Sequence, residues 1–154
     1  MKQQNPFNID TKIVTFLKKH HVLTLATVNK NQPYCCNCFY VYDETKNQFI
    51  FVSDNNTRHV NEAILNNNVA GSVVLETSSV GKIQGIQFMG NMRKVEGSEK
   101  THVTFLYLKK FPFAIVVKTI FWIIDLDFIK MTDNRLGFGK KLIWSQDSMN
   151  TKIV

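Results

Sequence analysis

The chain has 154 residues, 44% of them hydrophobic, with 12 phenylalanines and a formal net charge of +7. This length suits one domain over residues 1–154, with short flexible ends at 1–7 and 149–154, and the hydrophobic content excludes a disordered chain. The positive charge indicates an anionic partner, such as a phosphorylated ligand or a nucleic acid, without choosing between them.

The first half of the chain predicts a helix, three strands and a second helix. Residues 9–20 carry apolar side chains at helical spacing, with Asn8 as the expected N-cap. Three strands rich in β-branched and aromatic residues follow, separated by polar turns: 22–28, 34–42 and 48–52. The second helix is expected from about Thr57 to Asn67.

The second half predicts further strands around a third helix. Strands are expected over 69–76 and 82–96, and Gly85 and Gly90 in the latter indicate a bulge, a bend or a closely approaching backbone. A helix follows from Ser98 to about Lys110, and the strand period returns from 119. The segment 136–144 is expected to add an edge strand.

This order of elements predicts the fold class. Many short strands joined mostly by hairpin-length turns are typical of a closed antiparallel sheet with helices covering its ends. A parallel sheet would need a helix after nearly every strand. We therefore expect a mainly β protein with six or seven antiparallel strands and about three helices.

The start of the second helix is unusual. Residues 53–64 read SDNNTRHVNEAI, so Arg58 and His59 lie in the first turn, where the helix dipole is already positive. One interpretation is an exposed, charged turn. The other is a phosphate site made of backbone N–H groups, the Thr57 hydroxyl and the Arg58 guanidinium, beside the end of the preceding strand.

Three cysteines lie close together at Cys35, Cys36 and Cys38. An odd, crowded set is a poor disulfide framework and indicates a reduced, cytoplasmic setting. On a strand, Cys36 and Cys38 face one way and Cys35 the other, so the three cannot converge on one zinc ion. We expect no metal site here, and interpret these residues as small buried side chains or as one wall of a pocket for a flat ligand.

Several other functions are not expected from the sequence. Asp125 and Asp127 alternate with apolar residues, as on the solvated face of a strand, so no catalytic residue is named. The paired lysines are too sparse for a nucleic-acid site. No secretion signal is present, and the apolar stretch 111–126 is too short and too charged to span a membrane.

Longer motifs carry a family resemblance. They are VSDNNTRHVNEAILNNNVAGSV (52–73), QGIQFMGNMRKVEG (84–97), KFPFA (110–114) and FIKMTDNRLGFGKKLIWSQDS (128–148). Together they resemble the FMN-binding split β-barrels of the pyridoxamine 5′-phosphate oxidase-like superfamily, and within it the little-characterised bacterial YhbP-like branch. The last motif is the most specific.

The resemblance implies a homodimer with two FMN sites at the subunit interface. It places the cofactor contacts on three parts of the chain and on a basic residue of the partner chain: Ser53, Thr57, Arg58 and His59 at the phosphate, Cys36, Asn37 and Cys38 along the ring, Gln87 nearby, and Lys140 or Lys141 from the partner. Family oxidases carry an arginine and a lysine where this chain has Cys35 and Tyr40.

The function that the resemblance implies is therefore general. We expect an FMN-dependent oxidoreductase acting on an unknown small molecule, with FMN reduced by a nicotinamide. The specific oxidation of pyridoxamine phosphate is not implied, because its substrate-binding arginine and histidine have no clear match here. The alternative is a non-enzymatic split barrel that binds haem or binds or senses a flavin, and a haem would take an axial ligand from one of four histidines: His20, His21, His59 and His102.

Overall fold

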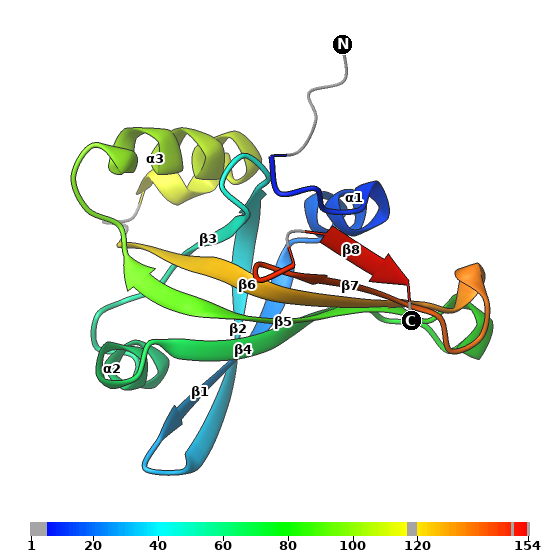
Figure 1. Ribbon diagram of the computed structural model, residues 1–154. Coiled ribbons are helices and arrows are strands. Elements are labelled where there is room, and N and C mark those ends of the chain that lie inside the picture. Colours follow the sequence, from blue (N-terminus) through cyan, green and yellow to red (C-terminus); the bar gives the residue numbers. More distant parts are fainter. Residues whose placement is uncertain (1–5, 117–119, 149, 154) are drawn as a thin grey trace.

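The computed structural model describes residues 6–116, 120–148 and 150–153, and one antiparallel sheet is its main feature (Figure 1). The strands are β1 (Val22–Asn29), β2 (Gln32–Asp43), β3 (Gln48–Val52), β4 (Asn68–Leu75), β5 (Gln84–Lys94), β6 (Phe121–Asp133), β7 (Lys141–Ser145) and β8 (Asn150–Ile153). The α-helices are α1 (Thr11–Lys19), α2 (Arg58–Leu65) and α3 (Glu99–Lys110). Short 3₁₀ turns are η1 (Val80–Lys82), η2 (Pro112–Val116) and η3 (Asn134–Leu136).

The sheet closes into a barrel. Its strand order is β3-β2-β1-β4-β5-β6-β7-β8, and β3 also pairs with β6, so the first six strands of that order form a ring. Strands β7 and β8 continue outward from β6 as an extension, which Figure 1 shows in orange and red. The predicted closed antiparallel fold with three helices is confirmed. The edge strand predicted over residues 136–144 corresponds to β7. It is an internal strand instead, because β8 pairs with its free side.

Both ends of the described chain are attached to this extension. Trp144 donates from Nε1 to the carbonyl oxygen of Phe7 at 2.8 Å, and their rings meet edge to face at 6.3 Å. Strand β8 occupies Asn150–Ile153. Flexible ends were predicted at residues 1–7 and 149–154, of which 1–5, 149 and 154 lie outside the described residues.

Helix α1 covers one end of the barrel. Its N-cap is Asp10, which accepts from the Lys12 backbone N–H at 2.7 Å. The prediction of Asn8 was wrong, because Asn8 turns the chain with φ 52° two residues earlier. The helix buries Ile13, Phe16 and Leu17, which carry the amphipathic pattern seen in the sequence.

The interior of the ring is packed with aromatic rings. Phe49 meets Tyr40 edge to face at 4.7 Å and Phe88 at 4.9 Å, and all three are buried. A second apolar cluster lies outside the ring, where α3 packs Val103 and Tyr107 on the other face of β3 and β6. Strands buried on both faces explain why β3 reads as an unbroken apolar run.

The two glycines of β5 differ in their surroundings. The register of β5 against β6 shifts between Met89 and Gly90, so the predicted irregularity lies at Gly90. A Cβ at Gly90 would overlap the carbonyl oxygen of Asp125 and lie 3.0 Å from its carbonyl carbon. A Cβ at Gly85 would lie 3.4 Å from the carbonyl oxygen of Val73, which is an ordinary contact distance.

Candidate functional site

The loop from β3 to α2 carries a cluster of polar side chains. Two backbone contacts fix its first member, because Ser53 donates its N–H to the Ile120 carbonyl at 3.2 Å and accepts from Trp122 Nε1 at 3.1 Å. Thr57 occupies the N-cap position of α2 four residues later, and His59 lies in the first turn. We call Ser53, Thr57 and His59 the turn cluster.

Short contacts join the turn cluster. Ser53 Oγ lies 2.7 Å from His59 Nε2 and 3.1 Å from Thr57 Oγ1, and Thr57 Oγ1 lies 3.3 Å from His59 Nε2. Thr57 donates its hydrogen to the Asp54 carbonyl at 2.9 Å. One arrangement then gives both contacts of Ser53 Oγ a hydrogen: His59 donates from Nε2 to Ser53, and Ser53 donates to Thr57. This tautomer leaves the lone pair of His59 Nδ1 facing away from the hydroxyls.

The start of α2 carries no carboxylate, unlike the starts of the other two helices. Asp10 caps α1, and Glu99 lies in the first turn of α3. In α2 the first turn has no acidic residue, and the side chain of Thr57 makes no capping hydrogen bond. Unpaired N–H groups and the helix dipole therefore give this turn a positive potential suited to an anion.

The side chain of Arg58 extends along α2 toward Glu62, one turn further on. Its Nε pairs with Glu62 Oε1 at 2.8 Å, and its guanidinium carbon lies 4.4 Å from the centre of the Tyr34 ring. Glu62 also accepts from Thr27 Oγ1 at 2.6 Å, and the hydrogen bonds from Thr27 and Arg58 hold its pKa below the ordinary value. The ion pair uses only Nε, so the two terminal nitrogens of the guanidinium are not part of it.

These contacts of Arg58 with Glu62 and Tyr34 were not predicted from the sequence. The spacing of Arg58 and Glu62, four residues apart on one helix, is a signal that could have found the pair. Thr27 and Tyr34 come from β1 and β2, and nothing in their local sequence links them to α2. The contact depends on the helix packing beside the β1–β2 hairpin (Figure 1).

Cys36 and Cys38 lie on the inner face of β2, beside the turn cluster. Their sulfur atoms are 3.9 Å apart, whereas Cys35 is exposed, which confirms the predicted alternation. The hydrogen bond from Cys38, followed by His59, lowers the pKa of Cys36 to about 5, although burial opposes the shift. The hydrogen bond to Cys36 and burial raise the pKa of Cys38.

Asn37 and Gln87 lie elsewhere, on the outer face of the barrel. Paired strands place them in one row, Asn37–Thr24–Ser72–Gln87, which spans about 14 Å from β2 to β5. Both side chains are exposed. The residues predicted to contact the flavin ring therefore lie on two faces of one chain. Cys36 and Cys38 are inside the barrel, and Asn37 and Gln87 are outside it.

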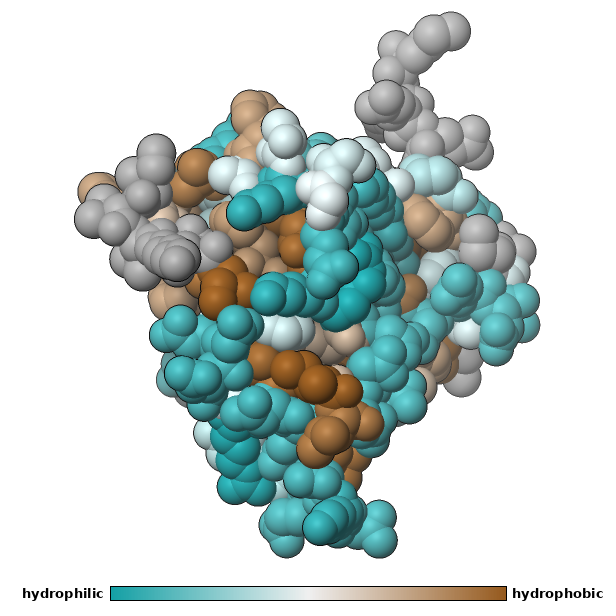
Figure 2. Space-filling view, turned by 90° about the vertical axis from the view of Figure 1, so that its left-hand side faces the viewer, coloured by the Kyte–Doolittle hydropathy of each residue, from teal (hydrophilic) through white to brown (hydrophobic). Residues whose placement is uncertain are grey.

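The outer face that carries this row is partly apolar. Its exposed apolar residues come from four neighbouring strands: Val22, Phe39, Val74 and Met89. A groove of about 470 Å³ crosses the same strands and is lined in part by Ala26, Ala70 and Met89. Figure 2 shows a second side of the molecule, the one that carries α2, where apolar patches are bordered by polar surface.

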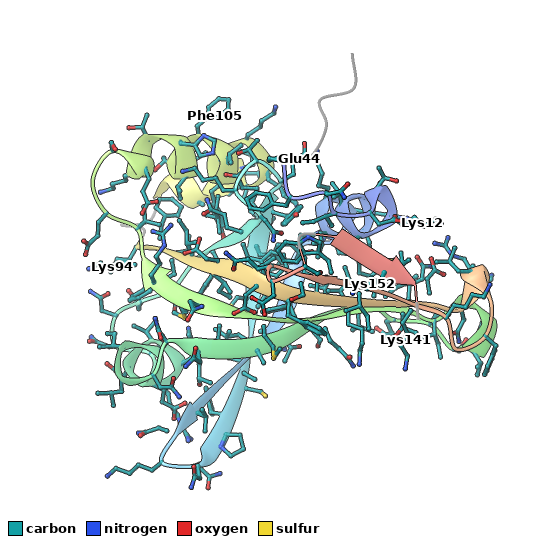
Figure 3. The ribbon with its side chains drawn as sticks, in the orientation of Figure 1. Lys12, Glu44, Lys94, Phe105, Lys141 and Lys152 are labelled. Atoms are coloured by element: carbon teal, nitrogen blue, oxygen red, sulfur yellow. The ribbon has the colours of Figure 1, made fainter. Side chains whose placement is uncertain are left out.

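Lys140 and Lys141 are far from the turn cluster within one chain. They follow the turn that η3 begins, where Lys140 donates its N–H to the Gly137 carbonyl at 3.2 Å. Figure 3 labels Lys141 at the end of the sheet opposite α2. Tyr40, where family oxidases have a lysine, is buried and donates its hydroxyl to the Leu17 carbonyl at 2.9 Å.

Residues 9–134 match the family model described as pyridoxamine 5′-phosphate oxidase. The chain belongs to this family. It is 40% identical over 131 residues to the UPF0306 protein plu4501 of Photorhabdus laumondii, covering 85% of this chain and 92% of that protein. It is 41% identical over 138 residues to the UPF0306 protein YhbP of Salmonella paratyphi C, covering 90% and 94%. The predicted YhbP-like branch is confirmed.

Solved structures of this fold include proteins named for two different ligands. The heme binding protein from Mycobacterium smegmatis matches with a TM-score of 0.69 at 12% identity, covering 87% of this chain and 57% of that one. The FAD binding protein from the same organism matches with a TM-score of 0.67 at 18% identity, covering 79% and 92%. These matches establish the split-barrel fold. Among the described residues, no helix is long and apolar enough to cross a membrane.

Proposed function

We propose that this protein is an FMN-binding flavoprotein that oxidises or reduces a small molecule. The turn cluster and Arg58 would hold the phosphate of FMN, at the helix start that has no carboxylate. The family and its FAD-binding neighbour support a flavin. The single observation that carries the proposal is the turn cluster itself, three polar side chains within 3.3 Å of one another at an uncapped helix start.

The residues present fit a phosphate ester. When a phosphate binds, the hydroxyls and the imidazole of the turn cluster would exchange their internal hydrogen bonds for bonds to the phosphate oxygens. The terminal guanidinium nitrogens of Arg58 can add a charge-assisted contact. Tyr34 and Glu62 hold that guanidinium in place. The groups that this chain lacks, at Cys35 and Tyr40, leave the anchor with fewer cations than in family oxidases.

The flavin, when bound, supplies the redox chemistry. The chain would bind its phosphate, orient its ring along β2 and exclude water from it. We further propose a homodimer, because Asn37, Gln87 and the apolar residues beside their row lie exposed on one face. A second chain on that face would bury them, and the proposed approach of Lys140 or Lys141 to the turn cluster would come from that chain.

Haem is the second candidate ligand, supported by the heme-binding neighbour of the same fold. An axial ligand is available on the inner face, where His59 is buried beside Cys36. Such a protein would be a binder or a sensor of its ligand. An absorption spectrum separates the two candidates, since flavin and haem have different bands.

The first experiment is the spectrum of the purified protein after incubation with FMN and desalting. Retained, shifted flavin bands support the proposal, and their absence from a folded protein contradicts it. Haem is then added in the same way, and a Soret band that is lost in His59→Ala supports the second candidate.

The anchor is tested by measuring FMN affinity in variants. Arg58→Ala is expected to weaken FMN binding by about 1.5–3 kcal/mol, the usual range for a hydrogen bond to a charged group. Lys12→Ala removes one exposed positive charge from α1, away from the turn cluster, and controls for net charge. Equal affinities of Arg58→Ala and Lys12→Ala would place the phosphate elsewhere.

The dimer is tested by light scattering. We expect twice the mass of one chain, and Phe39→Glu is expected to give a monomer because it puts a charge into the apolar outer face. A wild-type monomer at micromolar concentration would contradict an FMN site formed by two chains. FMN binding to such a monomer would still support the anchor.

A further inference from the structure

A set of potential metal ligands lies behind the turn cluster. One ligand atom each from Cys36, Cys38 and His59 can be chosen so that all three lie within 4.8 Å of one another. No metal site was expected here, because the three neighbouring cysteines cannot converge on one ion. The structure supplies the third ligand from α2, 21 positions beyond Cys38 in the chain.

The spacing of the two sulfur atoms matches a tetrahedral site. With a Zn–S bond of about 2.3 Å, the two sulfurs of a tetrahedral site lie about 3.8 Å apart. Cys36 and Cys38 have their sulfurs 3.9 Å apart. A disulfide would require about 2.05 Å. The pair can therefore bind a metal ion with almost no change in sulfur position.

The third ligand is oriented by the turn cluster. His59 Nε2 lies 2.7 Å from Ser53 Oγ, and the hydrogen-bond arrangement described above leaves Nδ1 with its lone pair. A histidine ligand commonly donates its other N–H to such an outer partner, which fixes the tautomer and the ring plane. Ser53 is in turn held by the backbone of Ile120 and by Trp122.

Burial gives the site one open side. Cys38 and His59 are each 8% exposed, whereas Cys36 is half-buried. Three protein ligands with solvent on one side are typical of a site with an exchangeable fourth ligand. Thiolates and imidazole select soft or borderline ions over magnesium and calcium.

The geometry points to a zinc site formed by Cys36, Cys38 and His59, with the fourth position open to water or a small ligand. This site does not depend on flavin binding. It uses Nδ1 of His59 and the inner face of β2, whereas the proposed phosphate anchor uses the hydroxyls and the Nε2 side of the same ring.

The test uses the full chain, reduced and free of flavin, titrated with Zn²⁺ against a chromophoric chelator. We expect one Zn²⁺ per chain. Removal of an outer partner of a metal ligand typically weakens metal binding by about 10–100-fold. Ser53→Ala removes such a partner and is expected to weaken Zn²⁺ binding by about 10-fold. Cys36→Ser removes a ligand itself and is expected to weaken it by at least about 100-fold. Cys35→Ser is the matched control, because Cys35 is adjacent on the same strand and exposed.

Cobalt gives an independent readout. Co²⁺ bound to wild type should show an intense thiolate charge-transfer band and the visible bands of a tetrahedral ion, and Cys35→Ser should keep both. Circular dichroism checks that each variant is folded. No stoichiometric Zn²⁺ binding by the reduced wild type, or an equal loss in Cys35→Ser and Cys36→Ser, would overturn the inference.

Discussion

Replacing Gly90 by alanine tests the closest backbone approach in the barrel. The new Cβ would overlap the Asp125 carbonyl oxygen and lie 3.1 Å from Cγ2 of Ile124. The backbone φ of Gly90 is not positive, so the cost comes from this overlap alone. Because the oxygen belongs to the paired strand β6, relief requires the two strands to separate by about 1 Å at the bulge.

We expect Gly90→Ala to lower the free energy of unfolding by about 3 kcal/mol, at the upper end of the cost of overpacking. For a chain of this size that corresponds to a fall in Tm of about 6–12 °C. The assay is urea unfolding followed by circular dichroism, with the m-value checked for constancy.

Gly85→Ala is the matched control, since it makes the same change in the same strand with 3.4 Å to the nearest atom. It should shift the unfolding free energy by less than about 1 kcal/mol, and by reducing unfolded-state entropy it can stabilise. If the two variants unfold at the same urea concentration, the approach of β6 does not explain the glycine at position 90.

Three further predictions concern the core and the buried acid. Phe49→Ala should cost about 3–5 kcal/mol in urea unfolding, because it removes the ring at the centre of the aromatic core; a loss below 1 kcal/mol would refute that packing. Tyr40→Phe should cost about 1 kcal/mol, because it leaves the buried Leu17 carbonyl without its donor, and an unchanged urea midpoint would contradict it. Burial raises the pKa of Asp43, but the hydrogen bonds from Thr45 and His102 outweigh it, so the folded-state pKa is lowered. The stability from Asp43 is therefore present above its unfolded-state pKa of about 3.9 and lost as pH falls through the lower folded-state value. The difference in unfolding free energy between wild type and Asp43→Asn should shrink as pH falls below about 4. The same difference at pH 5 and at pH 2 would be inconsistent with this.

Local sequence patterns predicted the elements of this fold well. Strand β3 was placed at its observed bounds, because QFIFV is a short apolar run between turn formers. The N-cap of α1 was misplaced because Asn8 and Asp10 are both good capping residues. The turn of the chain at Asn8 leaves Asp10 at the cap, and the contact of Phe7 with Trp144 just before that turn is one that no local pattern encodes.

The site was predicted in part. Ser53, Thr57 and His59 do come together, because they lie on one short loop and the helix that follows it. Cys36 joins them only through the packing of α2 beside β2, which no local pattern encodes. Asn37 and Gln87 were grouped with the cysteines, although alternation along β2 puts Asn37 on the opposite face. The proposed role of Lys140 requires the proposed second chain, which one sequence cannot place.

The pairing of β3 with β6 has a consequence for the newly synthesised protein. It joins Ile50 to Ile123, 73 positions later, and the contacts of Ile120 and Trp122 with Ser53 belong to the same closure. A nascent chain that has released only its first 110 residues from the ribosome contains every member of the turn cluster but lacks the strand that fixes Ser53. The turn cluster therefore takes its final geometry only after β6 has emerged, so the proposed ligand site is completed late in synthesis.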